Sequence, residues 1–73
     1  MPTAATGTYC PLEDHELAIV RLISRGATDA QIARATSRPA RTITSIVVRV
    51  MKRTDTVSRT HLVATALRNG WIA

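Results

Sequence analysis

Apolar residues recur at intervals of three and four positions in four runs, which short polar stretches separate. The first run predicts a helix from Asp14 to Arg25, and Gly26 follows it as a helix-ending glycine does. Thr28 and Gln31 then have the spacing of a capping box, so a second helix is expected to begin at Asp29. The apolar positions of this second helix allow only about two turns.

The third run is the longest, and we expect a helix from about Pro39 to Thr54, because proline is tolerated in the first turn of a helix. β-Branched residues are so frequent between Thr42 and Val50 that a strand is the alternative. Consecutive apolar residues break the alternation that a strand requires, and the run is long for a strand, which favours the helix. The predicted core face of this helix consists of Ile43, Ile46, Val47, Val50 and Thr54.

A fourth helix is expected after Ser58, a residue that often serves as an N-cap, and Gly70 ends it. The apolar stripe of this helix consists of Leu62, Val63, Ala66 and Leu67. Trp71 and Ile72 follow the glycine at the place where a chain folds back onto the last helical turn. The C-terminus is therefore expected to be anchored.

The chain of 73 residues is the size of one small domain, which excludes a multidomain enzyme. Residues 1–11 lack periodicity and contain two prolines and a glycine, so we expect a flexible leader followed by an all-α domain over residues 12–73. No apolar run approaches the roughly 18 residues of a membrane span. Residues 1–8 contain no Lys or Arg, so they lack the start of a secretory signal, and a cytoplasmic protein without a membrane partner is expected.

The residues that carry catalysis or bind metals are too few and too scattered for an active site. Cys10 is the single cysteine, and with His15 and His61 it gives neither a disulfide, nor a set of zinc ligands, nor a nucleophile paired with a base. We therefore expect no enzyme, no metal and no cofactor. The only aromatic residues, Tyr9 and Trp71, lie at the two ends, which argues against modules that stack nucleic-acid bases on aromatic side chains.

The positive charge is concentrated in the middle of the chain. The formal net charge is +5, and residues 30–54 contain six basic residues and no acidic one. A small basic domain is most simply explained by a polyanionic partner, and the alternative is that the cations only solvate helix faces.

A short helix, a tight turn and a longer helix with a basic, hydroxyl-bearing face is the arrangement of a helix-turn-helix. The pattern between about Leu12 and Leu67 resembles the LuxR/GerE-type helix-turn-helix domain without insertion or deletion. The resemblance is carried by Leu12, Glu16, Ile19-Val20, Leu22-Ile23, Gly26, Thr28-Asp29, Gln31-Ile32-Ala33, Thr42-Ile43, Val47, Val50, Arg53 and Ser58-Arg59.

This resemblance implies a four-helix domain of LuxR/GerE type that acts as a sequence-specific, DNA-binding bacterial transcription regulator. It would be cytoplasmic and nucleoid-associated, with the helix over about 39–54 in the major groove of double-stranded DNA. The positions expected to face bases are Thr44, Ser45 and Val48. Those expected to contact phosphates are Arg41, Thr42, Arg49, Lys52 and Arg53. The last helix would form a homodimer through Leu62, Val63 and Ala66.

The chain departs from the family pattern at several positions. It has Thr44 where the family usually has Lys, Ile46 where His is usual, and Pro39 where Ser is usual. Glu13 stands where Thr usually caps the first helix, which leaves Asp14 as a substitute cap. The alternative function is a helix-turn-helix-derived protein-interaction module that binds another regulator or RNA polymerase. Region 4 of sigma factors, which has the same helix arrangement, is a third possibility.

Overall fold

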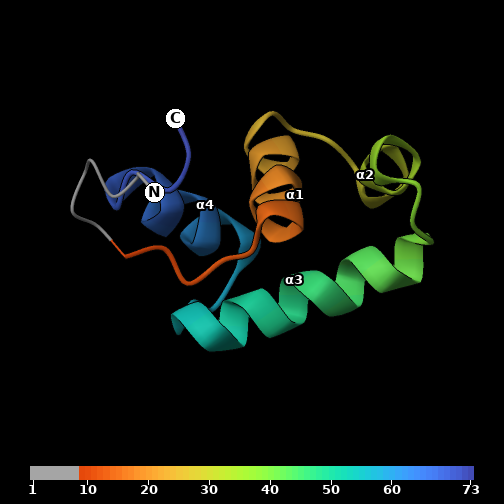
Figure 1. Cartoon of the computed structure of the whole chain (residues 1–73). Helices are drawn as coiled ribbons and strands as arrows, with labels where there is room; N and C mark the ends of the chain where they lie inside the picture. Colours follow the sequence, from red (N-terminus) through yellow and green to blue (C-terminus); the bar gives the residue numbers. More distant parts are fainter. Residues whose placement is uncertain (1–8) are drawn as a thin grey trace.

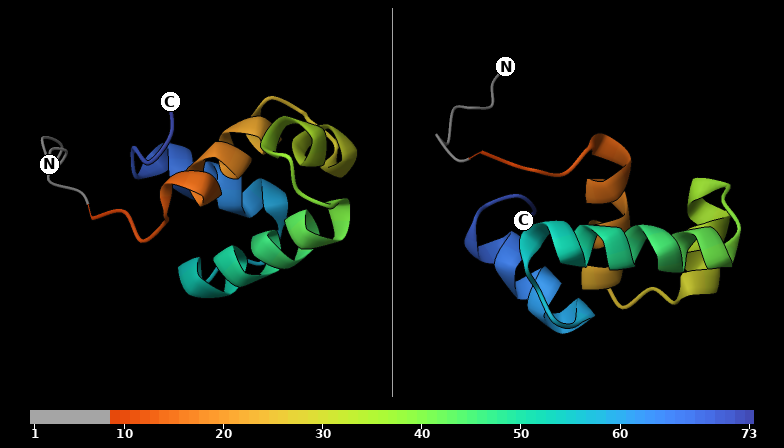
Figure 2. Two further views of the ribbon diagram at one scale, coloured as in Figure 1. Left: turned by 45° about the vertical axis from the view of Figure 1, so that its right-hand side comes forward. Right: turned by 90° about the horizontal axis from the view of Figure 1, so that it is seen from below.

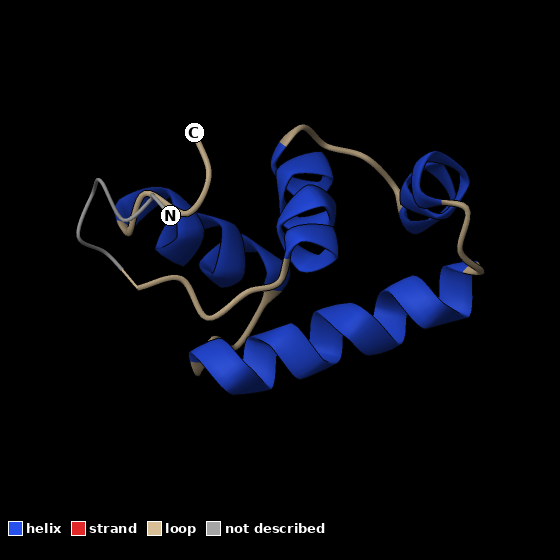
Figure 3. Ribbon diagram, in the orientation of Figure 1, coloured by secondary structure: helices blue, strands red, loops and turns tan. Residues whose placement is uncertain are grey.

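The computed structural model describes residues 9–73, which form four α-helices and no strand (Figure 3). The helices are α1 (Asp14–Ser24), α2 (Asp29–Thr36), α3 (Ala40–Thr54) and α4 (Arg59–Arg68). The all-α fold is therefore confirmed for the described residues, and the strand alternative for residues 42–50 is wrong. The expected first helix ends one residue earlier than predicted, and Pro39 is the N-cap of α3 rather than its first residue.

The predicted N-caps of α2 and α4 are confirmed. The amide of Gln31 donates to Thr28 Oγ1 at 3.1 Å, and the amide of Thr28 donates to Gln31 Oε1 at 2.8 Å. Ser58 Oγ accepts from the amide of His61 at 3.0 Å. These bonds satisfy amides that the first turn of a helix leaves without an intrahelical partner.

The start of α1 differs from the prediction, because Glu13 and not Asp14 is the N-cap. The amide of Glu13 donates to Glu16 Oε1 at 2.9 Å, so the side chain in the first turn reaches back to the cap residue. Asp14 lies inside the helix as its first residue. A capping-box arrangement is therefore present in α1 although the usual Thr is absent.

The core is aliphatic and receives residues from every helix. The predicted core face of α3 is confirmed at four of its positions, since Ile43, Ile46, Val47 and Val50 are all buried, while Thr54 is only half-buried. Ile32 of α2 has no exposed surface. The buried apolar residues are Leu12, Ile19, Val20, Ile32, Ile43, Ile46, Val47, Val50, Leu62, Ala66 and Ile72. Each helix thus contributes buried residues to a single shared centre, and α2 contributes only Ile32.

The arrangement of the helices leaves one side of α3 uncovered. In Figure 1, α3 runs along the lower edge of the molecule, with α1 above its middle and α2 above one end. The second helix is seen nearly end-on in the same view, so α2 and α3 cross at a steep angle, and residues 37–39 join them. In Figure 2, α4 lies beside α1 on the side away from α2. Other helices pack on α3 from one side only.

Both ends of the described chain contact the helical body. The amide of Trp71 donates to the carbonyl of Ala66 at 2.9 Å and Ile72 is buried, which confirms the anchored C-terminus. Of the predicted leader, residues 1–8 lie outside the described residues. Residues 9–11 belong with the body, because Trp71 Nε1 donates to the carbonyl of Tyr9 at 3.2 Å and Arg53 Nη1 to that of Pro11 at 3.3 Å. Across residues 9–73, no helix combines the length and the apolar character that crossing a membrane requires.

Candidate nucleic-acid interface

The side of α3 that faces away from the core carries six exposed residues, which we call the outer face of α3: Arg41, Thr44, Ser45, Val48, Arg49 and Lys52. Their spacing of three and four residues places them on one continuous face. All three positions expected to face bases belong to it, as do three of the five expected to contact phosphates. The side chain of Val48 is an apolar exception, with the residue 39% exposed.

The three cations of the outer face have no partner among the residues that the structure describes. Within residues 9–73, the side chains of Arg41, Arg49 and Lys52 form neither a salt bridge nor a hydrogen bond. These three side chains are therefore solvated, and they can bind an anion without breaking a contact to another described residue. Cations held at this reach around a helix face suit phosphate oxygens on either side of a groove.

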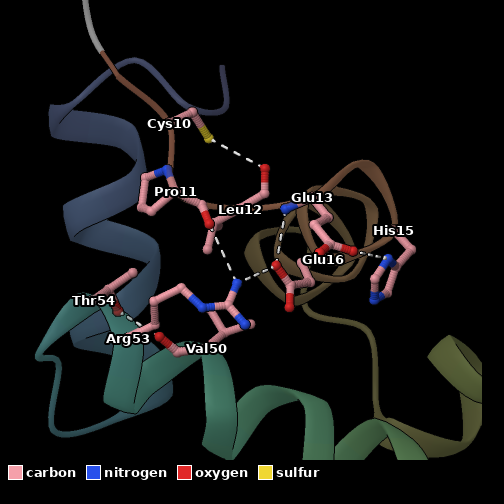
Figure 4. Close-up of polar contacts among 9 residues, drawn as sticks. All are labelled: Cys10, Pro11, Leu12, Glu13, His15, Glu16, Val50, Arg53 and Thr54. Carbon is pink, nitrogen blue, oxygen red and sulfur yellow. Dashed lines mark hydrogen bonds and ion pairs between the residues drawn. The ribbon is translucent and has the colours of Figure 1, made fainter.

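Arg53, the fourth predicted phosphate-binding cation, is placed differently. Its Nη1 donates to Glu16 Oε1 at 2.6 Å and to the carbonyl of Pro11, so it ties α3 to α1 and to the N-terminal segment (Figure 4). Glu16 is only 4% exposed. Burial raises the pKa of Glu16, but the hydrogen bonds from Arg53 and from the Glu13 amide lower this pKa by more than burial raises it. The pKa of Glu16 therefore lies below its ordinary value.

Thr42 lies in the first turn of α3 and is half-buried, unlike the residues of the outer face. Its amide donates to the carbonyl of Pro39 at 3.0 Å. Pro39 supplies no side-chain acceptor to the start of this helix. Within the described residues, the first amides of α3 thus lack the side-chain cap that α2 and α4 have, and the positive end of the helix dipole is open beside Arg41.

The two hydroxyl groups of the outer face donate their protons to acceptors in the protein. Thr44 Oγ1 lies 3.0 Å from Asp29 Oδ2 and 3.4 Å from the carbonyl oxygen of Ala40. Ser45 Oγ lies 3.2 Å from the carbonyl oxygen of Arg41, four residues earlier in the helix. The contact between Thr44 and Asp29 links α3 to the first residue of α2.

Asp29 is also bound by Arg59, the first residue of α4. Both guanidinium Nη atoms donate to the carboxylate, Nη1 to Oδ1 and Nη2 to Oδ2, the latter at 3.0 Å. The hydrogen bond from Arg59 is the largest cause of a lowered pKa at Asp29, and burial opposes it, while the bond from Thr44 adds to the lowering. The same pair raises the pKa of Arg59. One carboxylate therefore connects α2, α3 and α4.

Two of the three residues expected at a dimer interface lie in the core. Leu62 and Ala66 are 0% exposed, so the structure places them in the core of the protomer and not on its surface. They pack inward because they are the core stripe of a short helix. Val63 is half-buried and lines an open groove of about 320 Å³ between α1 and α4. The groove is lined by Ile23, Ser24, Arg59, Thr60, Val63, Ala64 and Leu67.

The ion pairs Arg53–Glu16 and Arg59–Asp29 were not predicted, although the sequence contains an indication of each. Glu16 is an acid in the middle of an apolar stripe, which indicates a buried carboxylate that needs a cation. Asp29 is the first residue of a predicted helix, and the helix dipole alone favours an acidic residue at that position. The partners, Arg53 and Arg59, lie 37 and 30 residues away along the chain, which periodicity cannot connect.

Comparison of the chain with protein-family models, with curated proteins and with solved structures gives no match.

Proposed function

We propose that this protein is a sequence-specific, DNA-binding transcription regulator of bacterial type, with α3 as its recognition helix. The observation that carries the proposal is the outer face of α3. Three cations that have no side-chain partner within residues 9–73 surround Thr44, Ser45 and Val48 on the exposed side of a helix whose other side is buried. A duplex supplies both the phosphates and the base edges that such a face suits.

The placement of α3 supports insertion into a groove. The helix runs along an edge of the molecule, and α2 lies above one end of it (Figure 1). Such a placement is compatible with a helix-turn-helix, in which the second helix lies in the major groove and the first crosses the backbone. The LuxR/GerE-type domain is the specific form that we propose.

The residues of the outer face divide by chemistry. We assign Arg41, Arg49 and Lys52 to phosphates, because their charges are exposed and free within the described residues. Thr42 and the open start of α3 would add contacts of the same kind. Thr44 and Ser45 would contact polar base edges, and Val48 suits the methyl group of thymine.

A homodimer on two half-sites is part of the proposal. The surface available for it is the groove between α1 and α4, where Leu67 is 49% exposed and Val63 and Ile23 are half-buried. Leu62 and Ala66 would support this surface from the core rather than touch the partner.

The second candidate is a protein-interaction module that binds another regulator or RNA polymerase. The exposed Val48 on the outer face favours it, because an apolar side chain among cations also suits a protein surface. Binding to duplex DNA of random sequence separates the two functions, since only the first predicts it.

The test is to select bound sequences from a random duplex library and to measure affinity by fluorescence anisotropy. Arg49→Gln/Lys52→Gln removes two charges from the outer face, and Arg21→Gln/Arg25→Gln removes two exposed charges from α1 and its end. We expect the first variant to lose at least about tenfold in affinity for every duplex while the second stays near the wild type. Wild-type protein that neither binds nor enriches any sequence, or equal losses in both variants, would overturn the proposal.

A further inference from the structure

The hydroxyl of Thr44 has two partners in the protein, and both can only accept a hydrogen bond. They are the Asp29 carboxylate, at 3.0 Å, and the backbone carbonyl of Ala40, at 3.4 Å. A hydroxyl has one proton to donate and two lone pairs with which to accept. The proton of Thr44 is therefore committed inside the protein. Thr44 is nevertheless exposed, so its oxygen remains open to a partner from outside as an acceptor.

Arg59 keeps the acceptor in place. It donates to both oxygens of Asp29, which holds the carboxylate in one orientation and in its ionised form. An ionised carboxylate has no proton with which to donate to Thr44. The direction of the hydrogen bond is thus fixed by chemistry, and it runs from Thr44 to Asp29.

We infer that Asp29 is a positioning residue that makes Thr44 a pure acceptor and so selects a base with an amino group in the major groove. The inference rests on the proposed function. A free threonine hydroxyl can donate or accept and contacts either kind of base edge. An acceptor-only oxygen fits the N4 amino group of cytosine or the N6 amino group of adenine, and it opposes the O6 of guanine and the O4 of thymine.

The arrangement also assigns a role to Thr44 itself, at the position where the pattern that this chain resembles usually has a lysine. A lysine ammonium only donates, and therefore suits the acceptors of guanine. Thr44 held by Asp29 has the opposite polarity. The two side chains would accordingly select opposite strands of the same base pair.

The test uses the DNA sequence that the wild-type protein selects, remade with single base analogues. In one series each adenine or cytosine in turn lacks its N6 or N4 amino group, and in the other each guanine or thymine lacks its O6 or O4 oxygen. Wild-type protein and Thr44→Val are measured on both series. Valine has the shape of threonine without its hydroxyl. If the loss of affinity caused by one analogue, its penalty, disappears in this variant, that analogue identifies the base that Thr44 contacts.

We expect that analogue to lack an amino group, with a penalty of about 3- to 10-fold in wild-type affinity, the size of a single hydrogen bond. Asp29→Ala leaves only the more distant acceptor, the Ala40 carbonyl at 3.4 Å, so the hydroxyl becomes able to donate outside the protein and the penalty should shrink. When Thr44 is already valine, Asp29→Ala should change nothing at this base. Arg59→Met removes the ion pair that holds the Asp29 carboxylate in one orientation, so the penalty should shrink in this variant as well. Circular dichroism identifies the variants that are folded, and only these variants are compared.

The opposite result is a loss of affinity on an analogue that lacks O6 or O4, where Thr44→Val abolishes that loss. It would show that Thr44 donates, and it would overturn the inference while leaving the proposed function intact. The inference is equally overturned if Thr44→Val alters no base preference, or if folded Asp29→Ala keeps the full amino penalty. The wild-type and Thr44→Val arms decide the matter even if Asp29→Ala does not fold. Absence of any sequence preference in the wild type would overturn the proposed function together with the inference.

Discussion

Nη1 of Arg53, near the end of α3, lies 2.6 Å from Oε1 of Glu16, a carboxylate almost entirely enclosed by the domain (Figure 4). The same nitrogen donates to the carbonyl of Pro11, and the same carboxylate oxygen accepts from the amide of Glu13. One ion pair thus joins the C-terminal end of α3, the first turn of α1 and the segment before it. It fixes the position of α3 relative to the rest of the fold.

This pair predicts that acid destabilises the domain. The pKa values of Glu16 and Asp29 are lowered in the folded protein, so the unfolded chain binds protons at higher pH than the folded one. The free energy of unfolding should therefore be constant near neutral pH and fall as the pH drops through about 4 and below. Glu16→Gln should cost about 1 kcal/mol at pH 7 and make the acid decline shallower.

Thermal unfolding of both proteins between about pH 3 and 7, followed by circular dichroism, measures this dependence. Asp14→Asn is the control, since it removes a carboxylate from the exposed side of the same first turn. Parallel stability curves for wild type and Glu16→Gln over the whole range would show that the ion pair does not contribute.

Ile32 provides the corresponding test of the core. It has no exposed surface, and an isolated carboxylate at such a place costs several kcal/mol, against a total stability of about 5 kcal/mol for a domain of this size. Ile32→Asp should be unfolded at neutral pH. Ala35→Asp, at an exposed position of the same helix, should keep most of the wild-type helical signal and melting temperature. An Ile32→Asp variant that melts like the wild type would contradict the packing of α2.

Local features of the chain were sufficient to predict the helices. Each of these features depends on residues that are at most four positions apart in the chain. The structure confirms the caps at Thr28 and Ser58 and the apolar stripe of α3. The roles of Leu62 and Ala66 could not be predicted in this way. An apolar stripe does not indicate whether it faces the domain's own core or another protomer. Asp29 and Arg59 meet only because α2 and α4 both pack against α1 and α3, which brings the starts of the two helices together.

On the outer face of α3, the cations should determine the affinity for any duplex, and the other side chains should determine the sequence preference. Lys52→Ala removes a free cation and should weaken binding to all sequences nearly equally, with a salt dependence flatter by about one unit. Val48→Ala and Ser45→Ala should instead relax the preference at particular bases, by about 1 to 3 kcal/mol where a good contact is lost. The ratio of affinities for selected and scrambled duplex, at one salt concentration, measures each effect. A ratio that changes with Lys52 and not with Val48 or Ser45 would reverse these assignments.

The groove between α1 and α4 should hold the second protomer. Leu67→Glu places a charge on an exposed apolar position, so the monomer should fold while pairing is lost. We expect sedimentation of the complex on a duplex with two half-sites to give two wild-type protomers bound cooperatively, and independent, weaker binding for the variant. Val57→Glu, at an apolar residue that is 86% exposed outside the helices, serves as the control. Unchanged cooperativity in Leu67→Glu would exclude this surface as the dimer interface.

The salt dependence of binding to duplex DNA is the sharpest test of α3 as a DNA-binding helix, because it counts the phosphates that the protein neutralises. If two protomers each neutralise about four phosphates, the logarithm of the association constant should fall against the logarithm of salt concentration with a slope of about −7. A slope near zero would contradict the account, since the free cations on the outer face of α3 would then have no phosphate to bind.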